Sequence, residues 1–330
     1  GAAADPPGLP VRRVVVAGRW DGASPLLPTG AALEEISRGV RAGCEGADVA
    51  LLPFGSGPTF DEAVAASRAQ ASFVRVPTDA RSTRDAGERV AQVLGQRMVV
   101  VEGGHNAFPD CGLGFLAGLL GVPDCQVVGE GLPEALTRAE ELVAASGTDL
   151  VCAASTPRPL LGLDSVLAVA PDLEPIEEQD TAMTGLLTEA FAHRPARRRA
   201  LLAGTDTHPA RGYGSGAAGG VGAIIAASGG RIVPTGQLLT DLLDLDEALK
   251  TANLLIIAEP ELASPLLATS TLDCLTGAAE QLALPVVALT TRSSLSRYER
   301  AQWGLHGVFE TEACVTLEDA GRRIARTWLR

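Results

Sequence analysis

Lysine is almost missing from this sequence. Of its 27 basic residues only Lys250 is a lysine, and the rest are arginines. Aromatic residues make up 4% of the chain, so a hydrophobic core has to be built from Leu, Val, Ile and Ala. No apolar run approaches the roughly 20 residues of a membrane-spanning helix. The net charge of −13 argues against general binding to nucleic acid or to an anionic membrane, since both need a positive surface.

Paired cysteine motifs are missing too. None of the six cysteines forms a C-x-x-C pair. Their distribution is typical of cysteines that act as small buried apolar residues in a reducing compartment, although disulfides stay an open alternative. Residues 1–10 have neither the basic region nor the apolar core of an export signal, and we interpret them as a flexible tail. The sequence therefore predicts a cytoplasmic protein. The cysteines are Cys44, Cys111, Cys125, Cys152, Cys274 and Cys314.

The chain does contain short β-branched runs that alternate with longer helical patterns, which is typical of an α/β fold. Its 330 residues allow two domains. A polar segment, 171–211, is the least regular part. The expected strands are 13–17, 49–53, 72–76, 98–101, 150–154, 253–258, 285–289 and 308–310. The expected helices are 31–42, 62–69, 84–94, 134–145, 238–249, 271–282 and 317–329, with an apolar helix that ends at Leu120.

Four loops that follow expected strands are the first places to look for chemistry. Open α/β sheets bind ligands at the carboxyl ends of their strands. If the strands are parallel, these loops open towards the same side. They are residues 18–24, 54–59, 102–114 and 259–265.

A glycine-rich stretch, residues 212–222, has six glycines in eleven positions and precedes an apolar, helix-compatible run. Gly214, Gly216 and Gly219 satisfy the dinucleotide pattern G-x-G-x-x-G, but a polar loop stands where that pattern needs a strand. A helix start of this kind leaves amide groups that can face an anion. The alternative is a packing site or hinge without a ligand, because glycine allows close backbone approach.

Other polar constellations are weaker. His105 beside Asp110 can form an acid–base pair, although a loop histidine bonded to backbone is the simpler interpretation. Asp206 and His208 are a similar case. The basic run 194–199 is more typical of a solvated helix end than of a binding patch.

Several loops together resemble one family, the bacterial type I glycerate kinases. Residues 214–222 (GSGAAGGVG) are similar to the family's G-x-G-A-A-G-G-L-G, and residues 159–162 (PLLG) to its N-P-L-L-G. Residues 110–114 (DCGLG), behind Gly103 and Gly104, resemble G-G-S-A-T-N-D-G-G-A-G with one residue inserted. Glu259 falls where the family has the Glu of G-E-G-R-L-D. Residues 285–289 (PVVAL) match the strand G-K-P-V-I-A-L.

The resemblance covers nearly the whole chain, from about Arg13 to Leu329, and implies a two-domain α/β fold. One domain, residues 11–80 plus 265–330, is expected to be flavodoxin-like or Rossmann-like with a parallel sheet. The inserted α/β domain, 81–264, would contain the glycine-rich stretch. The active site would lie in the cleft between them and bind a small anionic ligand. The oligomeric state stays open.

The departures from the family concern its charged residues. Where the family reads P-D-S-F-K, this chain has Asp21 in place of the lysine. The D-G-G-E-G motif becomes residues 56–60 (SGPTF), which lack both carboxylates. The acidic residue before N-P-L-L-G becomes Ser155, and the asparagine of that motif becomes Arg158. Arginines near these motifs could replace the lost lysines, but the two side chains differ in geometry; they are Arg19, Arg158 and Arg211.

The resemblance implies ATP and Mg²⁺ as cofactors of an active enzyme, with no metal ligand assigned. Loop carboxylates that could bind Mg²⁺ are Asp21, Glu102, Asp110, Glu259 and Glu261. It implies catalytic roles for Asp110 and Glu259. Phosphate or anion contacts are expected from Gly103, Gly104, Arg158, Gly214, Gly216 and Gly219.

Three functions stay open on this basis. The first is ATP-dependent phosphorylation of glycerate or a similar small hydroxy acid, weakened by the substitutions. The second is a non-catalytic protein of the same fold that binds a small anion or nucleotide. The third is a structural or partner-binding role, in which the glycines serve packing alone.

Overall fold

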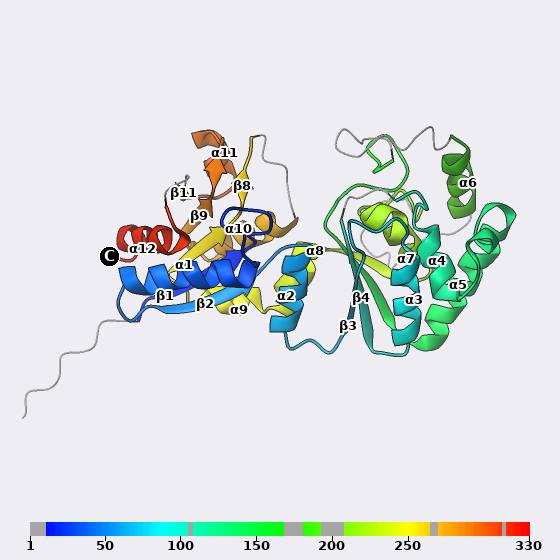
Figure 1. Cartoon of the computed structure of the whole chain (residues 1–330), viewed down its shortest axis with the longest axis horizontal. Coiled ribbons are helices and arrows are strands. Elements are labelled where there is room, and N and C mark those ends of the chain that lie inside the picture. The colour runs from blue at the N-terminus through cyan, green and yellow to red at the C-terminus, as the bar shows by residue number, and fades with distance from the viewer. Residues whose placement is uncertain (1–10, 105–107, 168–180, 193–207, 265–269, 312–314) are drawn as a thin grey trace, which may run out of the picture. The chain divides into compact units, whose positions relative to one another are not determined.

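The computed structural model describes residues 11–104, 108–167, 181–192, 208–264, 270–311 and 315–330. The chain forms two compact units (Figure 1). Unit 1 comprises Gly1–Ser67 and Leu239–Arg330, and unit 2 comprises Arg68–Leu238. Unit 2 is therefore inserted into the sequence of unit 1. The expected two-domain α/β fold with parallel sheets is confirmed.

Unit 1 is built on a five-stranded parallel sheet in the order β11-β9-β7-β1-β2. Its strands are β1 (Arg13–Gly18), β2 (Asp48–Pro53), β7 (Leu254–Ala258), β9 (Val286–Thr290) and β11 (Gly307–Glu310). Two short strands, β8 (Glu261–Leu262) and β10 (Arg292–Ser293), pair separately. The helices are α1 (Thr29–Gly43), α2 (Pro58–Ala66), α9 (Leu245–Lys250), α10 (Ser270–Gln281), α11 (Arg297–Gln302) and α12 (Leu317–Trp328).

The sheet of unit 1 is buried on both faces, which explains why its central strands are continuous apolar runs. On one face, β1 contributes Val14 and Val16 to a core with Leu33 and Ile36 of α1 and Ile324 of α12. The intervening residues of β1 and β7 are also buried, and α10 contacts β1.

The central strand β1 lies between β7 and β2, in register at their carboxyl ends. Gly18 pairs with Ala258 on one side and with Pro53 on the other. The chain runs from β1 to β2 on one side and later returns to β7 on the other side. The strand order therefore reverses at β1, and the carboxyl ends of β1 and β7 flank the position where open α/β sheets bind ligands.

Unit 2 contains a four-stranded parallel sheet in the order β3-β4-β5-β6. Its strands are β3 (Ser72–Arg75), β4 (Met98–Gly103), β5 (Asp149–Ala154) and β6 (Arg231–Pro234). The helices are α3 (Arg84–Val93), α4 (Leu113–Leu120), α5 (Leu132–Ser146), α6 (Thr181–Ala192) and α7 (Val221–Ala227). Short 3₁₀ turns are η1 (Asp124–Gln126), η2 (Gly129–Gly131) and η3 (Ala217–Gly220), and α8 (Thr235–Leu242) crosses the boundary to unit 1.

One core cluster holds unit 2 together. Val99 and Val101 of β4 pack with Phe115 of α4, Leu136 of α5 and Ile224 of α7, and all five side chains are inaccessible to solvent. The apolar α4 is buried along nearly its whole length.

Glycines allow the helices α1 and α12 of unit 1 to touch backbone to backbone. A Cβ on Gly39 would lie 1.9 Å from the carbonyl oxygen of Glu318, and one on Gly321 would lie 2.3 Å from that of Ile36. Gly43 faces Arg322 in the same way, at 2.5 Å from its carbonyl oxygen. Such distances leave no room for any side chain.

The limits of the units differ from the expected boundaries at both ends. Strand β3 pairs with β4 of unit 2, and β7 lies between β1 and β9 of unit 1, so strand pairing places both outside the expected ranges. Strand β6 has no counterpart among the expected strands. The expected helix 238–249 is divided into α8 and α9 at Asp244, which has a left-handed backbone conformation with φ 48°.

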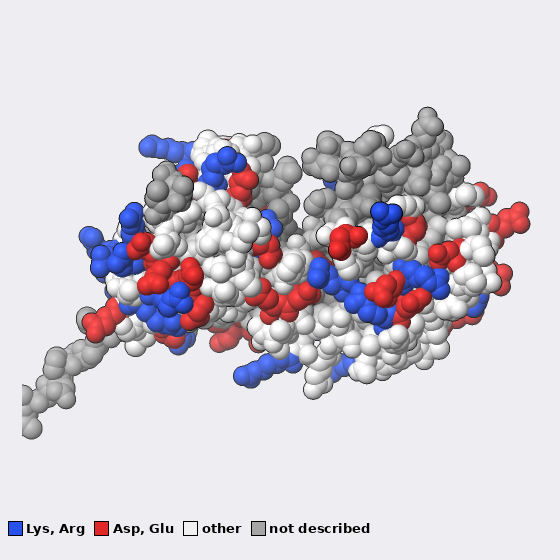
Figure 2. Space-filling model, viewed as in Figure 1, with Lys and Arg blue, Asp and Glu red and all other residues white. Residues whose placement is uncertain are grey.

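In the described part of the chain, no helix is both long enough and apolar enough to span a bilayer. Acidic and basic side chains are interspersed on the face seen in Figure 2. The expected tail 1–10 and the basic run 194–199 lie outside the described residues.

Candidate functional site

Arg19 and Glu259 form an ion pair at the point where the strand order of unit 1 reverses. Arg19 directly follows β1, and Glu259 directly follows β7. The Nε and Nη2 atoms of Arg19 lie 2.9 Å and 2.8 Å from the same oxygen, Oε1 of Glu259. The glutamate side chain is 12% exposed and the arginine side chain 37% exposed. The pair is therefore held mainly away from water, with the arginine at its open side.

The surroundings shift the pKa of both groups upward. Burial raises the pKa of the Glu259 carboxyl, and this outweighs the lowering by Arg19; the nearby Asp21 raises it further. Burial lowers the pKa of the Arg19 guanidinium, but the attraction and hydrogen bond of Glu259 raise it by more. A buried carboxyl with a raised pKa at a ligand-binding edge is a candidate acid or base, and Arg19 is its fixed positive partner.

Asp21 belongs to the same loop and is held by two buried threonines. Its carboxylate accepts a very short hydrogen bond from Oγ1 of Thr59 and a longer one, at 3.5 Å, from Oγ1 of Thr29. The two threonine oxygens lie 2.6 Å apart, and Thr29 Oγ1 also accepts from the backbone N–H of Trp20 at 3.0 Å. The loop after β1 is thereby fastened to the start of both α1 and α2.

Glu62 of α2 completes this arrangement at the N-terminus of α1. Its Oε1 accepts from Thr29 N at 3.0 Å and its Oε2 from Gly30 N at 2.6 Å. Helix α1 has Pro28 at its cap position and no side-chain cap of its own. A carboxylate from another helix therefore satisfies its first amides and faces the positive end of its dipole.

The glycine-rich stretch lies in unit 2 and is closely packed against the carboxyl ends of β4 and β5. A Cβ on Gly103 would lie 2.3 Å from the Cβ of Ala218, and one on Gly214 would lie 2.8 Å from that of Ala154. A Cβ on Gly216 would lie 2.7 Å from the carbonyl oxygen of Pro159. Such close contacts are expected if the glycines of this stretch serve packing rather than ligand binding.

Backbone hydrogen bonds connect the stretch to other candidate residues. Ala218 N donates to Gly104 O at 2.7 Å, and Gly216 N donates to Arg158 O at 3.0 Å. The guanidinium of Arg158 contacts the backbone oxygen of Asp164 at 3.4 Å. Gly219 has a positive φ of 66° within η3. The structure thus brings the predicted anion-binding residues of unit 2 together, while Glu259 belongs to unit 1.

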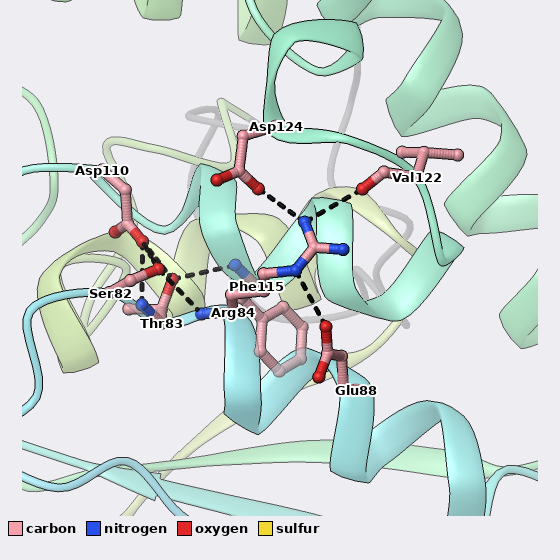
Figure 3. A network of polar contacts seen from close by, with 8 residues as sticks. All are labelled: Ser82, Thr83, Arg84, Glu88, Asp110, Phe115, Val122 and Asp124. Carbon is pink, nitrogen blue, oxygen red and sulfur yellow. Dashed lines mark hydrogen bonds and ion pairs between the residues drawn. The ribbon is translucent and has the colours of Figure 1, made fainter.

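Asp110 fastens the loop after β4 to the start of α3 (Figure 3). Its Oδ2 accepts from Ser82 Oγ at 2.8 Å and from N and Oγ1 of Thr83 at 2.8 Å and 3.0 Å, while Oδ1 accepts from Gly112 N at 3.1 Å. Thr83 Oγ1 in turn accepts from Phe115 N of α4 at 2.8 Å. These contacts suit a structural carboxylate, and a catalytic role for Asp110 stays a prediction.

We expect Asp110→Asn to lower the free energy of unfolding by about 2 kcal/mol, because an amide nitrogen replaces an acceptor of charge-assisted hydrogen bonds. Urea unfolding followed by circular dichroism measures the change. Glu88→Gln is the matched control: Glu88 accepts an exposed bond from Arg84 in the same network (Figure 3), and its loss should change stability by less than about 0.5 kcal/mol. Equal stability of Asp110→Asn and wild type would contradict the structural role.

The remaining candidates have simpler surroundings. His105 and Asp206 lie outside the described residues. The ring of His208 contacts the backbone of Thr188 and Ala210. Burial raises the pKa of the Cys152 thiol to about 12, with the buried Glu102 as a further cause, so this thiol stays protonated and unreactive at neutral pH.

No group of three or more His, Cys, Asp or Glu side chains in the described residues is arranged to hold a metal ion. The Asp21 carboxylate is nevertheless an oxygen donor of the type that Mg²⁺ prefers. Mg²⁺ commonly binds through one or two carboxylates together with substrate phosphates, so Asp21 fits that mode.

The sequence patterns did not indicate the threonines and Glu62 as parts of this site. The sequence places Thr59 at the end of the loop 54–59 and Glu62 at the start of an expected helix, without a role for either side chain. A signal was present in the position of Thr59, which follows β2 at the same sheet edge as Arg19 and Glu259. The pattern of a single loop carries no information on which residues of another loop it meets.

Comparison with known proteins gives one family. The sequence model described as "Glycerate kinase family" matches residues 65–329 of this chain. Among solved structures, the crystal structure of a candidate glycerate kinase 2 from Salmonella typhimurium LT2 is similar, with a TM-score of 0.63 and 18% sequence identity over 96% of this chain and 97% of that one. At this identity the similarity concerns the fold. No curated protein matches the sequence.

Proposed function

Because the chain belongs to the glycerate kinase family, we propose that it binds glycerate or a similar small hydroxy acid and phosphorylates it with ATP, at a reduced rate. The observation that carries this proposal is the Arg19–Glu259 pair beside Asp21, at the carboxyl ends of β1 and β7. The pair places a positive group, which can bind an anion, next to a carboxyl with a raised pKa. Both groups lie at the sheet position that is typical of ligand sites.

Each side chain has a role in this proposal. Arg19 presents to Glu259 the edge of its guanidinium formed by Nε and Nη2, so the opposite edge can receive the carboxylate of a hydroxy acid. Glu259 in its ionised form accepts the proton of the substrate hydroxyl as that oxygen attacks the terminal phosphorus of ATP, while the bond from this phosphorus to the bridging oxygen breaks and ADP leaves. A bound Mg²⁺ would supply charge neutralisation on the phosphates, with Asp21 as its candidate ligand.

The reduced rate follows from the scarcity of lysine. Phosphoryl transfer relies on Lys, Arg and metal ions that stabilise charge on the transferred group. The family's lysine is Asp21 in this chain, and the single lysine, Lys250, lies on α9 in an exposed pair with Glu247. Arginine supplies the charge with a different geometry.

The same scarcity of lysine favours a second candidate, a protein that binds the hydroxy acid or nucleotide without phosphoryl transfer. Lys250 forms its bond to Glu247 at 2.6 Å, and its side chain is 59% exposed. A site of this kind would keep Arg19 for anion binding and use Glu259 to hold the arginine in place.

ATP as phosphoryl donor implies that the protein works in the cytoplasm. Thiols in a reduced state are in keeping with that compartment. The free cysteines among the described residues are Cys44, Cys111, Cys125, Cys152 and Cys274.

Isothermal titration with D-glycerate and with ATP–Mg²⁺, together with a coupled assay of ADP release, tests the proposal. We expect heat with both ligands and glycerate-dependent ADP release. In Glu259→Gln the release should fall by about 10²-fold or more, as for loss of a general base. Glu261→Gln is the matched control, because Glu261 lies two residues further on, at the start of β8, in an exposed pair with Arg292, and the activity of this variant should change less than about threefold.

The three outcomes are distinct. Heat with glycerate but no ADP release would favour the second candidate. An equal loss of activity in both variants would remove Glu259 from the mechanism. Absence of heat with either ligand would overturn both candidates and leave a structural or partner-binding role.

A further inference from the structure

Thr290, the last residue of β9, and Thr291 after it contact the peptide group that follows Pro260, one residue beyond Glu259. Oγ1 of Thr291 donates to the carbonyl oxygen of Pro260 at 2.6 Å. Oγ1 of Thr290 lies 3.1 Å from the same oxygen and 3.1 Å from the carbonyl oxygen of Arg292, so its one proton is shared between these two acceptors. The backbone N–H of Thr291 donates to the Pro260 oxygen as well, at 3.1 Å. The Pro260 carbonyl therefore accepts two bonds from Thr291 and a shared one from Thr290.

The backbone on both sides of Glu259 is fixed as a result. Its own N–H donates to the carbonyl oxygen of Leu289 at 3.0 Å, which extends the pairing of β7 with β9. The pyrrolidine ring of Pro260 fixes φ at the next residue. The bonds to the Pro260 carbonyl then fix the orientation of the following peptide plane.

The chain stays paired beyond this point. β8 and β10 form a short parallel ladder in which Glu261 pairs with Arg292 and Leu262 with Ser293. Ser294 N donates to Leu262 O at 2.9 Å. The threonines are thus placed between the main sheet and this ladder, where a shift of the loop after β7 would have to break their bonds.

We propose that Thr290 and Thr291 are positioning residues for Glu259: their hydroxyls hold the Pro260 carbonyl and so keep the glutamate side chain buried against Arg19. Neither threonine is assigned a contact with substrate. The catalytic consequence rests on the proposed function of Glu259, but the positioning itself can be measured without a substrate.

The charged groups that act on Glu259 are Arg19 and Asp21, both from the loop after β1. Burial is the largest cause of the upward shift of the Glu259 pKa. Removing the hydroxyls leaves the backbone bond from Thr291 N to the Pro260 carbonyl but loosens this peptide group, which lets water reach the Glu259 carboxyl. Since hydration stabilises the ionised form, the pKa should then fall towards that of an ordinary glutamate.

The experiment compares the full-length wild type with Thr290→Val/Thr291→Val, in which valine keeps the shape of threonine and removes both hydroxyls. Carboxyl ¹³C NMR of protein labelled in glutamate gives the pKa of Glu259, and its resonance is assigned by its loss in Glu259→Gln. Thr291→Val alone serves if the double variant does not fold, as judged by circular dichroism. Thr291→Ser restores the hydroxyl.

We expect the Glu259 pKa to fall in the double variant, to fall partly in Thr291→Val and to match the wild type in Thr291→Ser. The matched control is Thr276→Val, because Thr276 is a buried threonine of α10 whose hydroxyl donates to Leu272 O at 3.1 Å; it should leave the Glu259 pKa unchanged. Binding of D-glycerate by titration calorimetry should weaken about tenfold in the double variant only.

An unchanged Glu259 pKa in a folded Thr291→Val or double variant would overturn the positioning role, whether or not glycerate binds. An equal pKa change in Thr276→Val would also overturn it, because the effect would then not be specific to these two residues. A wild type that gives no heat with glycerate would contradict the proposed function, and the NMR titration would still decide the role of the threonines.

Discussion

Replacing Gly220 by valine is expected to lower the free energy of unfolding by more than about 4 kcal/mol, enough to prevent unit 2 from folding. Gly220 has a φ of 121°, which L side chains rarely adopt, and a Cβ there would lie 2.2 Å from the carbonyl oxygen of Cys111. Neither backbone segment can yield easily, because η3 on one side and the loop held by Asp110 on the other are both bonded in place. The backbone strain at this φ and the steric clash of the new side chain therefore both lower the free energy of unfolding.

Urea unfolding followed by far-UV circular dichroism measures this effect. Fluorescence of the three tryptophans, Trp20, Trp303 and Trp328, reports unit 1 alone. Gly212→Ala is the matched control in the same stretch, since a Cβ there meets nothing within 4 Å. A Gly220→Val protein that melts like the wild type but no longer binds an anion would instead support ligand binding by this stretch.

Arg19→Met should destabilise unit 1 by about 2 kcal/mol at neutral pH, less than for a fully buried pair because the arginine side chain is 37% exposed. Methionine keeps much of the aliphatic packing and removes the charge. The Glu259 carboxylate then remains buried beside Asp21 without its positive partner, so its pKa rises further. The destabilisation is the cost of ionising this carboxyl inside the protein.

The pH dependence has a defined sign. Glu259 already has a folded-state pKa above its unfolded value, so its effect on stability is most favourable below the unfolded pKa, about 4.3, and is lost as the pH rises through the folded pKa. The difference between wild type and Arg19→Met should therefore be small near about pH 4 and large near about pH 7.5. In a Glu259→Gln background, Arg19→Met should cost little at either pH. A difference independent of pH would exclude an unpaired Glu259 as its cause.

Much of the fold could be predicted from local patterns. Buried parallel strands such as β1, β4 and β7 are short β-branched or leucine-rich runs, and their positions agree with the expectation to within a few residues. The family relationship was also evident from ordered motifs and is confirmed by the match over residues 65–329. By contrast, β6 lies at an edge of its sheet with little apolar signal, and strands β8 and β10 have two residues each.

The candidate site was harder to predict because its parts are distant in sequence. Glu259 could be singled out from its motif and Arg19 as a possible substitute cation, but 240 positions separate these two partners. Only the parallel register of β1 with β7 brings them together. The glycine-rich stretch was easy to find but ambiguous in function, since residues 214–222 have the composition of an anion-binding loop and also that of a tight packing contact.

The contact between α1 and α12 has a consequence for synthesis on the ribosome. Helix α1 forms from residues 29–43, yet the surface against which its glycines pack belongs to residues 317–328, near the end of the chain. Unit 2, which is continuous in sequence, emerges in full long before that point. The first strands of unit 1 must therefore keep an apolar face uncovered until residues 317–328 have been synthesised, and chaperones that bind nascent chains would protect that face during this interval.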